Sequence, residues 1–437
     1  MANMRDKLDA LMKKQGLMTG AEWVQQKQQE ESDRAAGRFD MPEVLPGEAV
    51  GEAGAAFYLV RQDFPASFMQ GNVPLGAVLD TQSQHIAFSS CDPELADFDP
   101  RTTLFMDTET IGLAGGTGTV AFLVGVGYFV DDGTFRLDQC FMRDFDEEEP
   151  MLAFLAERFI GYEAVVGYNS KCFDLPLLRT RFIQNRIPFR LDGFRHFDLM
   201  HAARRFWKDR LGSCTLNNVE RHILALTRKG DVASHLIPQL WFDYLRTRDA
   251  RRLKPVFYHH QMDILSLVSL TGLISQLLET PGGAGFTHAE DRLSFVRIHF
   301  RQRRYEQVVT NAMRFIEAEE SGPLRQECLT MLALAHKRLK DFAAMAETFE
   351  RLVEEFPSDI SARLELAKYH EHRSRDLVRA EALCQQALDR LDACRTVGRA
   401  PGVPATEYDA VSKRLARIRR KLRRGATGDD TGQLDME

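Results

Sequence analysis

The stretch LFMDTET, residues 104–110, decides how this chain folds and which chemistry it can carry. Three apolar residues predict a buried strand, and two carboxylates follow directly at Asp107 and Glu109. Because side chains alternate along a strand, residues two apart project from the same face. Taken alone, such a pair can also end a strand in solvent or cap neighbouring backbone amides. It becomes informative when the later acids of the chain are added.

Two further acids close conspicuous runs: Asp174 ends YNSKCFD at 168–174, and Asp263 ends YHHQMD at 258–263. An acid at a helix start also complements the helix dipole without any metal, so Asp174 has both interpretations. Carboxylate oxygens are the ligands of hard cations such as Mg²⁺ and Mn²⁺. Two such ions about 3.5–4 Å apart need a cluster of anionic oxygens. The four acids together therefore predict a two-metal phosphodiesterase.

A histidine on the last of these segments supplies a candidate base. His259 lies four residues before Asp263 on a helical pattern, which stacks the two side chains on one face, whereas His260 lies off that face. A single histidine on a helix is otherwise most often structural. We expect neutral His259 to take a proton from the attacking water, so activity should fall below its pKa, about 6.5 before local shifts.

The glycine-rich stretch GLAGGTGT, residues 112–119, follows the first two acids. Glycines let backbone amides approach a phosphate, but a flexible turn into the next strand explains the run equally well. The stretch lacks the lysine of a P-loop, which disfavours nucleotide-binding folds. The residues that we expect to contact substrate are Thr108, Thr110, Gly115, Gly116, Asn169 and Lys171.

Composition permits this function without demanding it. The 437 residues exceed the usual size of one domain, and a net charge of -6 restricts any nucleic-acid surface to a local patch. Seven cysteines, an odd number without a CxxC pair, favour free thiols in a reducing cytoplasm. The N-terminus lacks an apolar signal core, and the smooth apolar run 120–130 is shorter than the roughly 20 residues that cross a bilayer. We expect a cytoplasmic protein without a membrane partner.

Strand-like runs at 103–107, 119–130, 134–141 and 164–168, followed mainly by helical patterns, predict an α/β fold with a mixed sheet flanked by helices. Polar and glycine-rich segments divide the chain. The expected parts are a disordered tail at 1–55, a short β-containing lead-in at 56–100, a catalytic domain at 101–280, helical repeats at 291–395, and a basic helix with an acidic disordered tail at 396–437.

The helical part carries an approximate internal repeat. Ala333 and Ala367 are 34 residues apart, as are Ala346 and Ala380, which is the period of tetratricopeptide helix pairs. The basic segment KRLARIRRKLRRG at 413–425 puts its apolar residues on one stripe among eight lysines and arginines. It can cap the repeat array or contact nucleic acid. Near the N-terminus, the Leu8, Leu11 and Met12 stripe is either a partner-binding helix or a frayed end.

The motifs DTET, NSKCFD and HHQMD resemble those of the DEDD superfamily of 3′–5′ exonucleases, which have a ribonuclease H-like fold. More narrowly, the sequence is similar to YprB-type proteins in DTETIGLAGGTGTVAFLVGVGYF, in YNSKCFDLPLLRTRF and in the block LIPQLWFDYLRTRDARRLKPVFYHHQMDILSL. The likeness spans roughly 100–390 and includes the tetratricopeptide-like repeats. It implies a DNA-repair exonuclease that works with a helicase. It also implies that His259 is the base and that the metals are bound by Asp107, Glu109, Asp174 and Asp263.

The sequence departs from the superfamily at the base. The histidine subgroup has its base five residues before the last acid, where this chain has Tyr258, and the tyrosine subgroup uses the position of His259. Tyr258 is therefore the alternate base. Three functions compete: a 3′–5′ DNA exonuclease, an RNA exonuclease of the same chemistry, and a catalytically silent adaptor that binds nucleic acid and recruits a partner. Four intact acids disfavour the adaptor, because clustered negative charge is costly to keep without cations.

Overall fold

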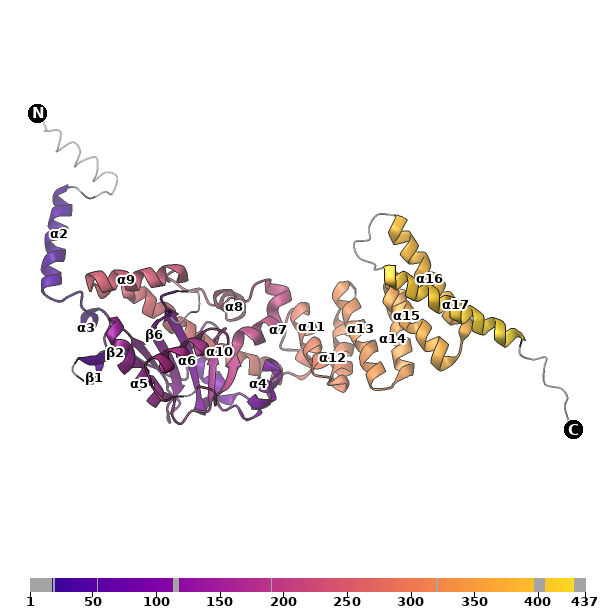
Figure 1. The fold of residues 1–437 in the computed structure, drawn as a ribbon, viewed down its shortest axis with the longest axis horizontal. Helices are drawn as coiled ribbons and strands as arrows, with labels where there is room; N and C mark the ends of the chain where they lie inside the picture. The colour runs from indigo at the N-terminus through magenta and orange to yellow at the C-terminus, as the bar shows by residue number, and fades with distance from the viewer. Residues whose placement is uncertain are drawn as a thin grey trace, which may run out of the picture. The chain divides into compact units, whose positions relative to one another are not determined.

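The computed structural model describes residues 18, 20–52, 54–112, 118–189, 191–319, 321–396 and 405–427. The chain forms two compact units, of which unit 1 comprises 1–204 and 213–276, and unit 2 comprises 205–212 and 277–437. Figure 1 gives the order of the elements along the chain. The predicted N-terminal stripe of Leu8, Leu11 and Met12 and the acidic tail at 428–437 lie outside the described residues.

Unit 1 is built on a seven-stranded mixed sheet in the order β1-β2-β7-β6-β5-β8-β9. Its strands are β1 (Glu48–Glu52), β2 (Ala55–Phe64), β5 (Thr103–Thr110), β6 (Ala121–Phe129), β7 (Phe135–Phe141), β8 (Ala164–Gly167) and β9 (Arg195–Asp198), and β3 (Met69–Gln70) pairs with β4 (Val73–Pro74). In sheet order, the neighbouring strands β1, β2, β7, β6 and β5 pair antiparallel with one another. On the other side of β5, β8 and β9 run parallel to it. The predicted α/β class with a mixed sheet is confirmed.

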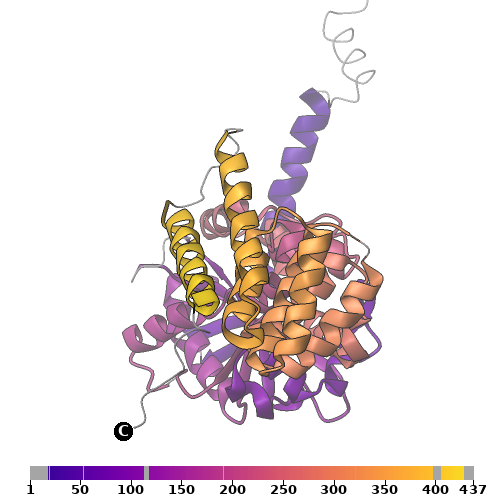
Figure 2. The same cartoon turned by 90° about the vertical axis from the view of Figure 1, so that its right-hand side faces the viewer.

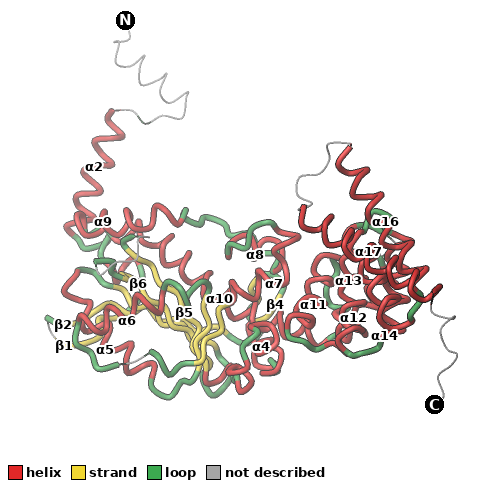
Figure 3. The backbone as a smooth tube through the Cα atoms, turned by 45° about the vertical axis from the view of Figure 1, so that its right-hand side comes forward, coloured by secondary structure: helices red, strands yellow, loops and turns green. Residues whose placement is uncertain are grey.

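Helices lie on both faces of this sheet, and α2 (Gly20–Ala35) projects away from it (Figure 3). The further helices of this part of the chain are α3 (Met41–Val44), α4 (Ser83–Ser90), α5 (Glu148–Phe159), α6 (Asp174–Gln184), α7 (Leu199–Leu211, whose residues from Arg205 belong to unit 2), α8 (Leu216–Ile223), α9 (Ile237–Thr247) and α10 (Lys254–Glu279). Leu104 and Met106 of β5 share a core cluster with the buried residues of α5 and α6. On the other face, α10 packs so closely against β6 that a Cβ on Gly125 would lie 2.2 Å from Cδ1 of Ile264.

Two expectations about the N-terminal region differ from the structure. Residues 20–52 include helix α2 and strand β1, and β1 pairs with β2 from Glu48↔Leu59 to Glu52↔Ala55. The expected disorder of 1–55 is therefore wrong for this part, because short polar strands gain their hydrogen bonds from a partner that composition does not reveal. Strand β2 in turn pairs with β7 from Tyr58↔Phe141 to Phe64↔Phe135, so the lead-in is part of the sheet.

Among the described residues, the helical stretch Ala250–Glu279 is long and apolar enough to cross a membrane by length and composition. Two thirds of its apolar window, 67%, is buried inside the structure. Its buried side chains include Ile264, Leu267 and Val268, which lie on the part of α10 that carries His259 and Asp263. A core helix of a soluble domain passes the same test, and α10 is buried in that way.

Unit 2 is helical, and each of its helices packs against the next one along the chain (Figure 2). They are α11 (Ala289–Arg301), α12 (Tyr305–Ala318), α13 (Pro323–Arg338), α14 (Phe342–Glu355), α15 (Ile360–Tyr369), α16 (Leu377–Thr396) and α17 (Ala405–Thr427). The alanines of the 34-residue repeat, Ala333, Ala346, Ala367 and Ala380, are all buried in one core cluster. Small residues at these positions let neighbouring helices approach closely, which explains their recurrence.

Helix α17 packs as the end of this array. Val411, Leu415 and Ile418 are buried in the core of unit 2, and Glu371 accepts ion pairs from Arg414, Arg417 and Lys421. These contacts support the capping interpretation of the basic helix. Its contact with nucleic acid stays a prediction.

Candidate metal and catalytic site

The two carboxylates of β5 lie on the part of the strand that is no longer paired with β8. β8 pairs with β5 over Thr103↔Ala164 to Phe105↔Val166 and then ends, so the part of β5 after Phe105 loses its parallel neighbour. Asp107 and Glu109 follow on this part, and both carboxylates keep a small exposed fraction, 20% and 14%. A register irregularity between Glu109 and Thr110 ends the regular pairing with β6. The predicted shared face of the two acids is confirmed.

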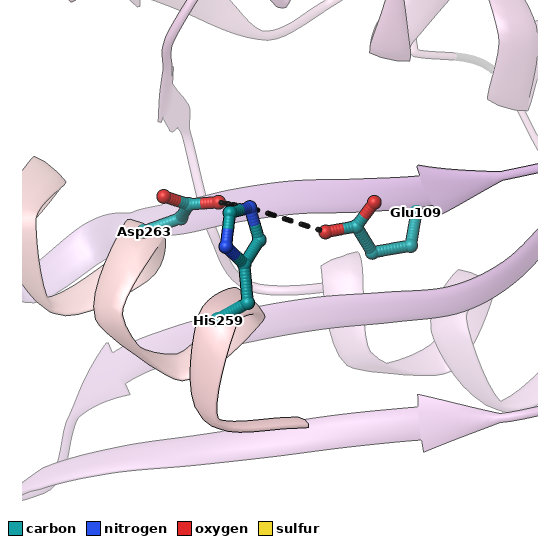
Figure 4. A group of neighbouring side chains, drawn as sticks. All are labelled: Glu109, His259 and Asp263. Carbon is teal, nitrogen blue, oxygen red and sulfur yellow. Dashed lines mark ion pairs between the residues drawn. The ribbon is translucent and has the colours of Figure 1, made fainter. Parts of the chain in front are cut away.

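Helix α10 brings a histidine and a third acid to the same place (Figure 4). Nε2 of His259 lies 3.4 Å from Oδ2 of Asp263 and 3.9 Å from Oε1 of Glu109. The candidate ligand atoms of these three residues all lie within 4.8 Å of one another. A divalent cation with ligand distances of about 2.0–2.2 Å spans such a group.

Asp174 begins helix α6 and completes the acidic group. It is buried, and the hydroxyl of Thr108 donates a hydrogen bond to its Oδ1. Burial raises the pKa of Asp174 to about 6, against the opposing effect of the Thr108 hydrogen bond. Thr108 lies on the α6 side of β5 between Asp107 and Glu109, so one strand contributes to the site from both of its faces.

The electrostatics of the group fit a bound cation. Burial raises the pKa of Asp107 well above its usual range, and the charges of Asp263, Asp174 and Glu109 raise it further. Burial and the charges of Asp263 and Asp174 likewise raise the pKa of Glu109. Mutual repulsion of this kind is relieved when dications neutralise the oxygens, and oxygen ligands are those that Mg²⁺ and Mn²⁺ prefer. The donor set therefore fits hard divalent metals.

His260, next to His259, has a structural role. Its Nε2 lies 3.0 Å from the main-chain oxygen of Asp107, and its Nδ1 lies 3.0 Å from Nε2 of Gln139. The side chain is fully buried, and burial lowers the pKa of His260 to about 4. Its Nε2 also lies 3.9 Å from Oδ2 of Asp107, but the main-chain carbonyl is nearer, whereas Nε2 of His259 lies near the carboxylates of Asp263 and Glu109. Tyr258, the alternate base, is half-buried one residue earlier on α10.

The predicted substrate-binding residues have other contacts within the protein. The Thr110 hydroxyl donates to the carbonyl of Gly112, while Asn169 and Lys171 are exposed, and their backbone amides donate to Asp198. Asn169 has a φ of 61°, so Asp198 holds this loop in a left-handed bend that an asparagine tolerates. Gly115 and Gly116 lie outside the described residues. Contact of all six residues with substrate stays a prediction.

Sequence reasoning missed three charged residues beside the site. Nδ1 of His259 lies 2.8 Å from Oδ1 of Asp231, and Arg228 pairs with both Asp263 and Glu220. Arg228 and Asp231 belong to the segment 224–233 between α8 and α9, which has neither helical nor strand periodicity. Their partners lie 28 and 35 residues away in the sequence. No local pattern predicts contacts of that kind.

Comparison with known proteins agrees with this geometry. Residues 104–275 match the model of the RNase H superfamily, and residues 326–369 match that of the tetratricopeptide repeat. The first match runs from β5 to α10 and so contains all four acids and His259. The fold and site thus define a ribonuclease H-like protein with a helical-repeat extension, a class whose nucleases use divalent metals.

The particular family follows from a relative. The chain is 30% identical to the protein described as "Uncharacterized protein YprB" of Bacillus subtilis (strain 168) over 328 residues, which cover 74% of this chain and 76% of the relative. The chain belongs to the YprB family of ribonuclease H-like proteins.

Proposed function

We propose that this protein is a metal-dependent 3′–5′ exonuclease that hydrolyses DNA and acts in DNA repair. The observation that carries the proposal is the convergence of four carboxylates from β5, α6 and α10 beside His259. The ribonuclease H-like fold supports phosphodiester hydrolysis. The exonuclease polarity, the DNA substrate and the helicase partner rest on the resemblance to the DEDD superfamily and to YprB-type proteins.

The residues divide the chemistry between them. Asp107, Glu109, Asp174 and Asp263 would hold two divalent ions, which when bound would lower the pKa of the attacking water and offset the negative charge of the phosphate. His259 presents Nε2 towards Glu109 and Asp263, where this nitrogen can accept the proton of the water. The Thr108 hydrogen bond keeps Asp174 turned towards β5. His259 is the base in this scheme, with Tyr258 as the alternate.

A nuclease assay tests the proposal directly. Purified protein is incubated with end-labelled single-stranded and double-stranded DNA and RNA, in Mg²⁺, Mn²⁺ or EDTA, beside the Asp107→Asn variant. We expect digestion of DNA from the 3′ end that requires metal and is lost in the variant. Digestion of RNA alone would replace the DNA substrate by RNA, and tight binding without digestion under every metal would leave an adaptor and overturn the enzyme.

A further inference from the structure

A buried charged pair beside the site has no part in the scheme above. Arg228 and Asp231 lie in the segment between α8 and α9, with side chains 4% and 15% exposed. Neither residue is in the acidic group that fits a metal, but Arg228 pairs with Asp263 of that group and Asp231 contacts His259 beside it. Burying a charge is costly unless it is paired, so their arrangement is specific.

Arg228 joins three elements. Its Nε donates to Oε2 of Glu220 on α8 at 2.8 Å, its Nη2 donates to Asp263 on α10, and its Nη1 lies 3.4 Å from Oδ2 of Asp231. A guanidinium offers five N–H donors in a planar, rigid fork, so it fixes the directions of the carboxylates around it. Glu220 is anchored in turn by the hydroxyl of Ser266, 2.5 Å away. Arg228 therefore fixes the positions of the Asp263 and Asp231 carboxylates relative to each other.

Asp231 sets the proton position on His259. An ionised carboxylate only accepts hydrogen bonds, so the 2.8 Å contact from its Oδ1 requires a proton on Nδ1 of His259. Arg228 Nη1 also lies near Nδ1, at 3.4 Å, but this contact is longer and its donor would need an unprotonated Nδ1. With the proton on Nδ1, the neutral ring has its lone pair on Nε2, which faces Asp263 and Glu109.

We propose that Asp231 is a positioning residue that holds His259 in the Nδ1–H tautomer with Nε2 unprotonated and turned to the acids, and that Arg228 fixes Asp231 and Asp263 relative to each other. The proposal rests on the proposed function, in which His259 Nε2 accepts a proton. A carboxylate on the far nitrogen of a histidine also stabilises the cationic ring once that proton has arrived. Asp231 acts through His259 and has no contact with substrate in this role.

The Asp231→Asn variant removes the negative charge and keeps the shape. Its amide can donate to Nδ1, as Arg228 Nη1 then can, while the carboxylates of Asp263 and Glu109 attract a proton on Nε2. We therefore expect the ring to change to the Nε2–H tautomer. Nitrogen-15 NMR of histidine-labelled, metal-free protein at alkaline pH distinguishes the two forms, and a His259→Gln variant assigns the signal.

Kinetics supply the second readout. We expect kcat of Asp231→Asn to fall by about 10²-fold or more, while KM and the dissociation constant for Mn²⁺ change by less than about threefold. Asp192→Asn is the matched control, because Asp192 is exposed, pairs with Arg179 on the surface and lies outside the site. We expect the control to keep the wild-type kcat and the wild-type His259 spectrum.

The proposal is overturned by an Nε2–H ring in the wild-type protein, or by a kcat of Asp231→Asn within about threefold of wild type. A fall in Mn²⁺ affinity as large as the fall in kcat also overturns it, since Asp231 would then support the metal site instead of the base. Failure of the proposed function is separate, because it appears as a wild-type protein that digests no substrate with any metal. The NMR result still decides in that case whether Asp231 sets the tautomer.

Discussion

The imidazole of His260 donates from Nε2 to the main-chain carbonyl of Asp107, 3.0 Å away. On its other side, the Gln139 amide lies 3.0 Å from Nδ1 and also donates to the carbonyl of Phe257. A neutral ring satisfies both contacts, because Nδ1 then accepts and Nε2 donates. The neighbour of His259 therefore ties α10 to the strand that carries the acids, and the two parts of the site are fixed to each other at this point.

The burial of the His260 imidazole makes stability depend on pH. Burial lowers the pKa of His260 to about 4 in the folded protein, against about 6.5 in the unfolded chain. Between these values the unfolded chain binds more protons, so the stability present above about 6.5 is lost as the pH falls towards 4. At pH 4.5 the free energy of unfolding is about 2.5 kcal/mol lower, because of His260 alone, than above pH 6.5.

Urea unfolding of metal-free wild type and His260→Gln near neutral pH and near pH 4.5 measures this term. We expect the stability advantage of the wild type over the variant to shrink by about 2.5 kcal/mol at the lower pH. A constant difference between the two proteins would mean that His260 is not buried in its neutral form.

Close packing at Gly125 predicts a second effect. Gly125 of β6 lies opposite Asp107, and a Cβ there would be 2.2 Å from Ile264 Cδ1 and 2.4 Å from His260 Cε1. Gly125→Ala should push α10 from the sheet, lowering the free energy of unfolding by about 1–3 kcal/mol and activity by at least about tenfold. Gly193→Ala is the control, since a Cβ there meets no atom within 4 Å. Denaturant unfolding and the nuclease assay decide, and full activity of Gly125→Ala would contradict the geometry.

Without bound metal, the clustered acids of the site are expected to lower the free energy of unfolding. The raised pKa values of Asp107 and Glu109 mean that the folded protein binds protons more tightly than the unfolded chain. Stability of the metal-free protein is therefore expected to fall as the pH rises above about 4, through the raised folded-state pKa values. Asp107→Asn removes one charge, so we expect it to raise stability in EDTA by about 1 kcal/mol or more while abolishing digestion.

Thermal unfolding of both proteins with and without Mn²⁺ measures this effect. Added metal should raise the Tm of the wild type and raise that of Asp107→Asn less, because one ligand is lost. A variant that is less stable than wild type in EDTA would show that the acids do not repel one another as the structure indicates.

The hydroxyl of Thr108 is expected to matter through Asp174. Thr108→Val keeps the shape but leaves the buried Asp174 carboxylate without this donor. We expect metal affinity to fall by about 10- to 100-fold, as with other groups that orient metal ligands. Calorimetric titration with Mn²⁺ gives the measurement. Thr180→Val is the control, because its hydroxyl donates to the carbonyl of Pro176 on its own helix. Equal affinities for the two variants would refute a role for Thr108.

Periodicity predicted those parts of the fold in which the sequence pattern is local. The apolar run before Asp107 and the helical pattern around His259 are local in this sense, and the second predicted correctly that His259 and Asp263 share a face. Strand β9, Arg195–Asp198, was missed, because a four-residue strand with the sequence RHFD has no alternation to detect. Its existence depends on parallel pairing with β8, which only the folded sheet supplies.

The candidate site, like the fold, was predictable only where its residues belong to a local sequence pattern. Acids that follow strands and helices carry a local signal, but Arg228 and Asp231 lie on a segment without periodicity and reach Asp263 and His259 only through tertiary contacts. The same limit applies to Thr108, whose hydroxyl pairs with an acid 66 residues away. A site can therefore depend on contacts between side chains of distant segments, and such contacts leave no recognisable pattern in the sequence.

Glu371 of unit 2 allows a test of the basic helix α17. Its side chain is 0% exposed, and its oxygens lie 2.6 Å from Nη1 of Arg414, 2.8 Å from Nε of Arg417 and 2.8 Å from Nζ of Lys421. Burial alone would raise the pKa of Glu371, but the hydrogen bonds from Arg417 and Lys421 outweigh it and lower the pKa to about 2. The resulting stability is present above the unfolded value of about 4.3 and is lost as the pH falls towards 2.

Glu371→Gln should therefore loosen α17 near neutral pH. We expect a loss of about 2 kcal/mol, because three cations lose their shared carboxylate, and faster cleavage of α17 by trypsin at its lysines and arginines. Glu350→Gln is the matched control, since Glu350 pairs with Arg379 on the surface of the same unit and both side chains are exposed by 36% or more. Digestion of a short DNA substrate should be unchanged in both variants, because the candidate site is formed by unit 1. Equal trypsin sensitivity of the two variants would show that Glu371 does not hold α17 and would remove the main support for its capping role.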